Sequence, residues 1–150
     1  MPVAATPQDA PPLTVHGTCV AVAGRAALIT GASGTGKSSL ALQLMAFGAR
    51  LVSDDQTLLA RRGPQVIATA PAPLVGLIEA RGIGLLRADA LAEAPLAVVV
   101  CLDQVERDRL PYAHYAEFCG QVFPCLHKVD SACFPAAIMQ YLKAGRRDPE

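Results

Sequence analysis

The eight residues from Gly31 to Ser38, GASGTGKS, satisfy the phosphate-binding loop pattern GxxxxGK(S/T). Glycines let such a loop curl so that successive N–H groups point at a phosphate. We therefore expect the loop to bind a nucleoside triphosphate, with Lys37 bridging its outer phosphates and the Ser38 hydroxyl binding Mg²⁺. The residues of this predicted cradle are Gly31, Ala32, Ser33, Gly34, Thr35, Gly36, Lys37 and Ser38.

The segments on either side supply the strand–loop–helix context that the motif requires. Residues 13–23 alternate between apolar and polar side chains and are rich in Val and Thr, and residues 26–30 are apolar. We therefore predict two short strands joined by a turn. After the loop, the run SSLALQLMAF predicts a mostly buried helix that ends near Gly48. The N-terminus of this helix would add its positive dipole end to the site. A glycine-rich turn without a ligand is the alternative, but a chance match rarely has this context.

A triphosphate site also needs an acidic partner for the metal, and two places in the sequence offer one. Asp103 ends the hydrophobic run AVVVCLD, whereas Asp54 and Asp55 follow a short apolar segment, Leu51-Val52, directly after the helix. Two adjacent carboxylates can divide the work, one orienting the metal and one accepting a proton from an attacking hydroxyl. The pattern alone leaves both places open, and a turn or cap is the alternative role for the pair.

The other elements are predicted from hydrophobic pattern and turn residues. They are a hairpin of residues 57–60 and 65–69, a short helix or extended segment at 74–80, a buried strand at 95–102, and a helix capped at 130–131 that runs to about residue 142. Residues 105–128 show no clean period. We predict one α/β domain over residues 13–145, with a flexible tail at 1–12 and a polar tail at 146–150.

Taken together, these residues resemble a known family. The segment VHGTCVAVAGRAALITGASGTGKSSLALQLMAFGARLVSDD resembles the core of the bacterial HPr kinase/phosphorylase catalytic domain. It has a His-Gly pair before the family's first strand, the phosphate-binding loop, and G-x-x-L-V-x-D-D after the helix. A second block, LIEARGIG from Leu77 to Gly84, is similar to that family's I-E-x-R-G-(L/I)-G segment. The resemblance implies a P-loop kinase domain of the HPr kinase/PEP carboxykinase type, with a central mixed sheet and flanking helices.

The resemblance also implies a reaction. The family uses ATP and Mg²⁺ to phosphorylate a serine of HPr, the small phosphocarrier of the sugar phosphotransferase system, which regulates carbon metabolism. Many members reverse the reaction by phosphorolysis. Carried over to this sequence, Ser38 and Glu79 bind magnesium and Asp55 accepts the proton of the substrate serine. His16 matches the active-site histidine and is expected close to one of the two aspartates.

Three further residues enter the predicted catalytic group with this resemblance. Lys37 neutralises phosphate charge, which suits a reaction that depends on positioning and electrostatics. Asp54 is the second carboxylate of the pair. Arg81 either holds phosphate or pairs with an acidic residue, and a surface ion pair is its alternative role.

The sequence departs from the family at three places. It looks like the truncated form with the catalytic domain only, and Ser39 stands where the family often has an acidic residue. The late arginine-containing loop, of V-R-P-G-R-N type, is missing, and LHKVDSACF stands at residues 126–134 instead. Because that loop is linked to phosphorolysis and to subunit contacts, its absence argues against the reverse reaction and against a hexamer, while leaving another homo-oligomer open.

Two other functions compete with a protein kinase. A regulatory module would bind ATP without phosphorylating a protein, but it would have no use for Asp55, Glu79 and His16 together. A small-molecule kinase would need lid arginines over the phosphates. The only candidates for such a lid in the latter third of the chain are Arg107, Arg109, Arg146 and Arg147.

The composition limits the kinds of binding partner and the cellular compartment that we expect. The formal net charge is +0, so no broad attraction to nucleic acid or an anionic membrane is expected. We predict a cytoplasmic protein, because no signal peptide or apolar run of about 20 residues is seen and the cysteines are odd in number. Four late residues could converge on zinc, although their spacing matches no compact zinc motif and ordinary buried or half-buried thiols are the simpler interpretation. They are Cys119, Cys125, His127 and Cys133.

Overall fold

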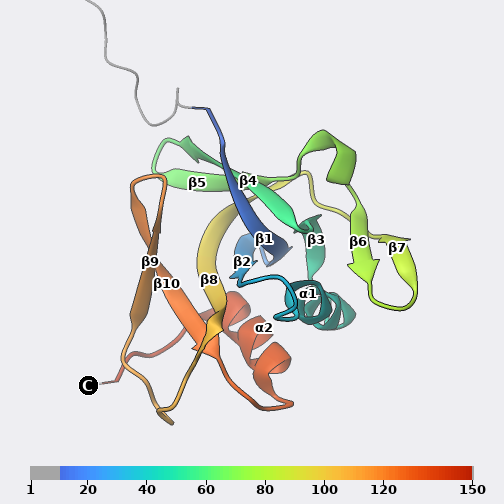
Figure 1. Cartoon of the computed structure of the whole chain (residues 1–150). Coiled ribbons are helices and arrows are strands. Elements are labelled where there is room, and N and C mark those ends of the chain that lie inside the picture. Colours follow the sequence, from blue (N-terminus) through green and yellow to red (C-terminus); the bar gives the residue numbers. More distant parts are fainter. Residues whose placement is uncertain (1–10, 150) are drawn as a thin grey trace, which may run out of the picture.

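The computed structural model describes residues 11–149, which form a mixed α/β fold (Figure 1). The strands are β1 (Leu13–Val22), β2 (Arg25–Thr30), β3 (Arg50–Ser53), β4 (Gln56–Arg62), β5 (Gln65–Thr69), β6 (Leu77–Ala80), β7 (Gly84–Arg87), β8 (Glu93–Val105), β9 (His114–Phe118) and β10 (Gln121–Lys128). The helices are α1 (Lys37–Ala46) and α2 (Phe134–Ala144), and η2 (Ala72–Leu74) is a short 3₁₀ turn. The predicted central mixed sheet with flanking helices is confirmed.

Eight strands form the main sheet, and its two long strands each change partners along their length. The first part of β1 pairs with β4, and the part from Gly17 onward pairs with β2. Strand β8 pairs first with β5 and then, in parallel, with β2 and β10. The order β2-β1-β4-β5-β8 therefore returns to β2, and the sheet folds over on itself. Strands β6 and β7 form a separate hairpin.

Gly17 lies at the point where β1 changes partners. A Cβ atom at this position would be 2.7 Å from the carbonyl oxygen of Ile29 in β2, so any other side chain would push the two strands apart. The Gly17 N–H donates a 2.9 Å hydrogen bond to the carbonyl of Asp55, just before β4. This close approach brings the start of β4 against β1.

The two helices pack together on one face of the folded sheet (Figure 1). One hydrophobic core lies between them and the strands, and it includes Leu44 of α1, Leu142 of α2 and Val100 of β8. A second core lies on the opposite face, where Val99 of β8 and Phe123 of β10 belong to the same cluster. Strand β8 is apolar at successive residues because helices cover one of its faces and other strands cover the opposite one.

Most of the elements expected from the sequence are present, and three differ. Strand β8 is longer than the predicted 95–102, and residues 105–128, which showed no period, include the β9–β10 hairpin. The segment predicted as 74–80 contains both a 3₁₀ turn and strand β6.

The prediction of a cap at residues 130–131 for the last helix was wrong. The helix begins at Phe134, and the Ser131 hydroxyl instead accepts a hydrogen bond from the Cys133 N–H in a local turn. Pro135, in the first turn, favours a helix start here because it has no N–H to leave unpaired. Most of the tail predicted for residues 1–12 lies outside the described residues. Within residues 11–149, no helix has the length and apolar character needed to cross a membrane.

Candidate nucleotide-binding and catalytic site

The loop from Gly31 to Ser38 connects the end of β2 to the start of α1, as predicted. Gly36 precedes the helix with φ of 96°, a left-handed conformation that costs glycine little. A Cβ at Gly31 would be 2.6 Å from the Thr35 hydroxyl oxygen, so the loop closes tightly only with glycine there. Thr35 fixes the turn, because its backbone N–H and its hydroxyl both donate to the carbonyl of Ala32.

Lys37 folds back onto this loop. Its side chain is buried, and its Nζ donates hydrogen bonds of 2.8 Å to the carbonyl of Gly31 and 3.1 Å to that of Ala32. The first turn of α1 contains no acidic residue that would satisfy the free N–H groups of the helix end. The loop therefore offers an ammonium group and backbone N–H donors to an anion.

Asp54 connects three elements around the loop. It is only 7% exposed. Its Oδ1 accepts hydrogen bonds from the Ser38 hydroxyl of α1 at 2.6 Å and the Thr18 hydroxyl of β1 at 2.9 Å. Its Oδ2 accepts from the backbone N–H of Glu79 in β6, also at 2.9 Å. The second carboxylate of the predicted pair, Asp55, is not part of this buried network.

Asp55 has an unusual backbone and an open side chain. Its φ of 69° lies in the left-handed region, which aspartate tolerates better than most residues. Its carbonyl accepts from the Gly17 N–H, and its own N–H donates to the Thr18 hydroxyl at 3.3 Å. The carboxylate is 63% exposed and lies 3.6 Å from Nδ1 of His16, so the predicted proximity of His16 to the aspartates is present in the structure.

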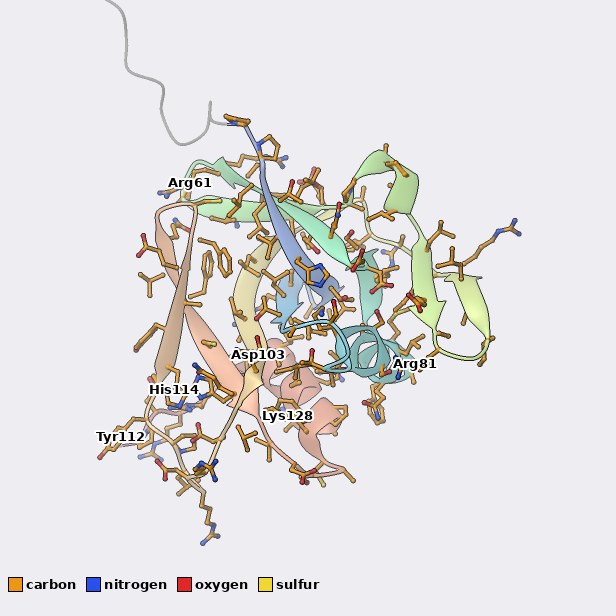
Figure 2. All side chains as sticks on the ribbon, viewed as in Figure 1. Arg61, Arg81, Asp103, Tyr112, His114 and Lys128 are labelled. Carbon is orange, nitrogen blue, oxygen red and sulfur yellow. The ribbon has the colours of Figure 1, made fainter. Side chains whose placement is uncertain are left out.

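Glu79 and Arg81 come to the site on the β6–β7 hairpin. Ile78, between Leu77 and Glu79, is buried in the core beneath α1, so the alternation of the strand turns Glu79 outward. Figure 2 shows Arg81 close to α1. An open pocket of about 230 Å³ brings most of the predicted residues together. Its lining consists of His16, Thr18, Ser33, Gly34, Gly36, Lys37, Ser38, Ser39, Asp55, Glu79 and Arg81.

Comparison with known proteins places this arrangement in a family. The family model described as the HPr serine kinase C-terminal domain matches residues 8–102, more than half of the chain. The chain belongs to the HPr serine kinase C-terminal domain family. The match includes the loop, both aspartates and Glu79, and it ends one residue before Asp103.

Curated relatives of this domain align with about half of the chain. The HPr kinase/phosphorylase of Bordetella pertussis is 51% identical over 78 residues, which are 51% of this chain and 25% of that protein. That of Clostridium beijerinckii is 44% identical over 77 residues, 51% of this chain and 26% of that protein. The aligned region thus spans about a quarter of the length of these relatives. The solved structure of the HPr(Ser) kinase/phosphatase from Coxiella burnetii shares the fold, with a TM-score of 0.76, 22% identity, and coverage of 87% of this chain and 88% of that one.

Asp103 has a different place in the structure from the one that its sequence pattern suggested. Its Oδ1 accepts a 3.0 Å hydrogen bond from the backbone N–H of Ala32, so it anchors the phosphate-binding loop to the end of β8. It does not line the pocket. The carboxylate in contact with the Ser38 hydroxyl is Asp54.

Thr18 is the residue of this site that the sequence reasoning missed. It is fully buried, donates to Asp54 and accepts from the Asp55 N–H. A signal was available, because Thr18 follows His16 by two residues in a strand and so lies on the same face.

The cysteines of the domain do not converge on a metal site within residues 11–149. Cys19 and Cys125 are buried, Cys119 is half-buried, and Cys133 is exposed. Burial raises the pKa of Cys19 to about 12 and also raises the pKa values of Cys119 and Cys125, which suits unreactive thiols.

A different group of ligand types, Glu106, His114 and His127, is close enough to share a metal. The hydrogen bond from His114, together with those from the backbone N–H groups of Asp108 and Arg107, holds the pKa of Glu106 below its ordinary range. The pKa of His127 is lowered mainly by its burial and, to a smaller extent, by the nearby His114. Of the four late residues that the sequence offered as zinc ligands, His127 alone belongs to this group.

Proposed function

We propose that this protein is an ATP- and Mg²⁺-dependent serine protein kinase that phosphorylates HPr or an HPr-like phosphocarrier. The observation that carries the proposal is the position of Asp54. Its hydrogen bonds to Ser38 and to the Glu79 backbone join the phosphate-binding loop to the hairpin that carries Glu79 and Arg81. The names of the curated relatives support HPr as the substrate.

The residues present suit a magnesium nucleotide. Mg²⁺ prefers oxygen ligands, and the Ser38 hydroxyl and the Glu79 carboxylate supply oxygens at the same pocket. Bound magnesium would neutralise charge on the phosphates. Lys37 would exchange the loop carbonyls that it now contacts for phosphate oxygens, and Gly31 to Ser38 would present their N–H groups.

The residues around Asp55 suit transfer to a hydroxyl group. In the proposed reaction, the serine oxygen of the carrier forms a bond to the γ-phosphorus while the bond from that phosphorus to the β–γ bridging oxygen breaks, releasing ADP. The serine proton passes to Asp55, whose exposed carboxylate can meet a protein substrate. His16 would orient this carboxylate, and Arg81 would hold phosphate oxygens from the hairpin.

We further propose that the protein acts in the cytoplasm in the control of carbon metabolism, and that transfer runs mainly forward. Residues 126–134, which stand in place of the family's late arginine loop, form the end of β10 and the approach to α2. This segment contains no arginine that could serve phosphorolysis or bind a neighbouring subunit as that loop does.

The pocket argues against a small-molecule kinase. Within the described part of the chain, Arg81 is the arginine that lines the pocket, and the four late arginines considered as a lid do not. An ATP-binding regulatory module remains the competing function.

A phosphorylation assay separates these functions. The protein is incubated with Mg²⁺, ATP labelled in the γ-phosphate, and purified HPr, and the modified residue of HPr is identified by mass spectrometry. We expect one phosphoserine that depends on Mg²⁺, and little return of label when inorganic phosphate is added. If ATP binds tightly but no phosphocarrier is labelled, the regulatory module is correct and the kinase proposal fails.

A further inference from the structure

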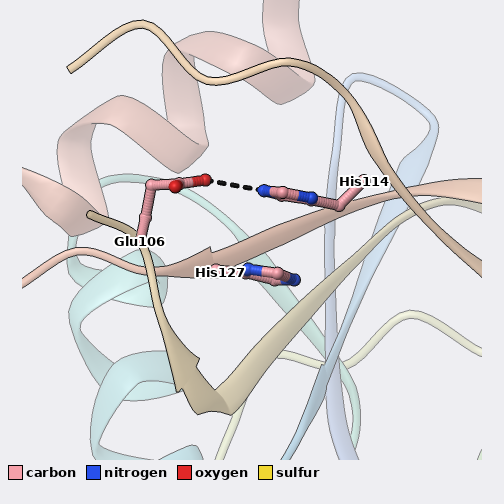
Figure 3. Close-up of side chains that lie close together, drawn as sticks. All are labelled: Glu106, His114 and His127. Carbon is pink, nitrogen blue, oxygen red and sulfur yellow. Dashed lines mark hydrogen bonds and ion pairs between the residues drawn. The ribbon is translucent and has the colours of Figure 1, made fainter. Parts of the chain in front are cut away.

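A second group of chemically active side chains lies at the other end of the sheet from β6 and β7. Glu106 follows β8 directly, His114 begins β9, and His127 is near the end of β10. One oxygen or nitrogen atom from each lies within 4.8 Å of the others (Figure 3). None of the three lines the pocket at Gly31–Ser38.

Neighbouring strands hold the three residues in place. Strand β10 pairs in parallel with β8 and antiparallel with β9, so it lies between the other two. Cys125, two residues before His127 on the same face of β10, is in register with His114. The Glu106 N–H donates a 2.8 Å hydrogen bond to the carbonyl of Lys128, beside His127. The backbone therefore keeps the three residues close together, while their side chains can still rotate.

Glu106 is oriented by its own loop. Its Oε2 accepts hydrogen bonds from the N–H groups of Arg107 at 3.1 Å and Asp108 at 3.3 Å. This leaves Oε1 directed at Nε2 of His114, 2.8 Å away. Hydrogen bonds to one carboxylate oxygen that free the other for a ligand are typical of metal-binding carboxylates.

The two imidazole rings are stacked, with their centroids 3.9 Å apart and their planes inclined by 5° (Figure 3). Parallel rings hold their in-plane nitrogen lone pairs in two separate planes that barely converge. One ring must therefore turn to share an ion with the other. Tetrahedral zinc with bonds of about 2.1 Å separates its ligand atoms by about 3.4 Å, so small rotations of partly exposed side chains are sufficient.

We propose that Glu106, His114 and His127 bind a divalent transition-metal ion of the zinc class. Two imidazoles and one carboxylate form a donor set that prefers such ions to magnesium, which takes oxygen ligands. With three protein ligands on a partly exposed surface, water completes the coordination. The site is separate from the proposed magnesium nucleotide site in both position and donor chemistry, so it stands whether or not the kinase proposal holds.

The test is a titration of the purified, metal-free protein with ZnCl₂ by calorimetry, and with Co²⁺ by visible spectroscopy. We expect one equivalent to bind, and Co²⁺ to give the d–d bands of a low-coordinate nitrogen and oxygen site without a thiolate charge-transfer band. Glu106→Gln and His127→Gln should each weaken zinc binding by at least about 100-fold, beyond what loss of an outer-shell partner causes. His16→Gln, which removes the chain's remaining histidine, and Cys133→Ser, which removes its exposed thiol, are the matched controls and should bind zinc as the wild type does.

Wild-type affinity in Glu106→Gln and His127→Gln would overturn the proposal, and so would a thiolate band or the absence of saturable binding. Circular dichroism of each metal-free variant shows whether it is folded. If a variant is not folded, anomalous diffraction at the zinc edge from wild-type crystals decides the question. A zinc peak between the three side chains supports the site, and a peak elsewhere or none contradicts it.

Discussion

The side of the molecule that carries Gly31–Ser38 and the side built from β9 and β10 use polar side chains differently. On the first side, Asp54 is buried and its oxygens accept three hydrogen bonds from three different elements. On the second, Glu106, His114 and His127 are half-buried, and the two imidazole rings meet face to face. The hydrogen bonds of Asp54 are in place before a ligand arrives, whereas the second group can still rearrange around one.

The largest expected effect is on catalysis at the first side. Asp55→Asn keeps the size of the side chain but removes the proton acceptor, so kcat for HPr phosphorylation should fall by about 10²- to 10⁴-fold. ATP affinity, measured by calorimetry, should change by no more than a few fold. Asp89→Asn, at an exposed carboxylate paired with Arg50, is the control and should leave kcat unchanged. Full transfer by Asp55→Asn would remove Asp55 as the base.

The next effect tests whether the second half of the chain supports the first. Leu142 of α2 is 0% exposed and belongs to the core shared with α1, the helix that follows the phosphate-binding loop. Leu142→Ala should lower the free energy of unfolding by about 3 to 4 kcal/mol, measured in urea, because it leaves a cavity. The neighbouring exposed change Lys143→Ala should stay within about 0.5 kcal/mol. A loss below about 1 kcal/mol for Leu142→Ala would show that α2 is not part of the common core.

A pair of substitutions separates the two carboxylates that contact the loop. The Asp54 carboxylate accepts three hydrogen bonds, and in Asp54→Asn the amide NH₂ group would face one of these donors with a donor of its own. This substitution should lower the free energy of unfolding by about 2 to 3 kcal/mol. It should also abolish tight Mg²⁺–ATP binding. Asp103→Asn can keep its oxygen toward the Ala32 N–H and should cost about 0.5 kcal/mol. Equal losses in the two variants would contradict the central place given to Asp54.

The smallest effect is expected at the surface. Arg62 and Glu93 form an ion pair whose side chains are 63% and 48% exposed. Glu93→Gln should change the unfolding free energy by less than about 1 kcal/mol, and 1 M NaCl should reduce the difference further. A loss of unfolding free energy above about 2 kcal/mol that persists in high salt would contradict this expectation, because an exposed ion pair is screened by water and salt.

The two sides also differ in how far the sequence predicts them. The phosphate-binding loop is predictable because its chemistry is contained in eight consecutive residues between a strand and a helix. His16, Asp55 and Glu79 could be placed by resemblance, and the structure brings all three to one pocket. The role of Asp54 as the link to β6 could not be predicted, because it depends on a backbone N–H that arrives from 25 residues later in the chain.

On the second side, no local pattern marks the group. Glu106, His114 and His127 belong to different strands or their ends, and only the pairing of β10 with both neighbours brings them together. The sequence suggested His127 with three cysteines as the alternative to ordinary thiols, because closeness along the chain was the available guide. In the structure Cys125 is buried, Cys119 is half-buried and Cys133 is exposed, and within residues 11–149 they form no metal-binding group.

The most direct test of the central claim is a crystal structure of the protein with Mg²⁺ and a non-hydrolysable ATP analogue. We predict that the phosphates lie in the loop from Gly31 to Ser38 and that Mg²⁺ is about 2.1 Å from the Ser38 hydroxyl oxygen. Asp54 should remain bonded to the Glu79 N–H, and the γ-phosphate should face Asp55. An analogue bound outside this loop, or a γ-phosphate directed away from Asp55, would contradict the account.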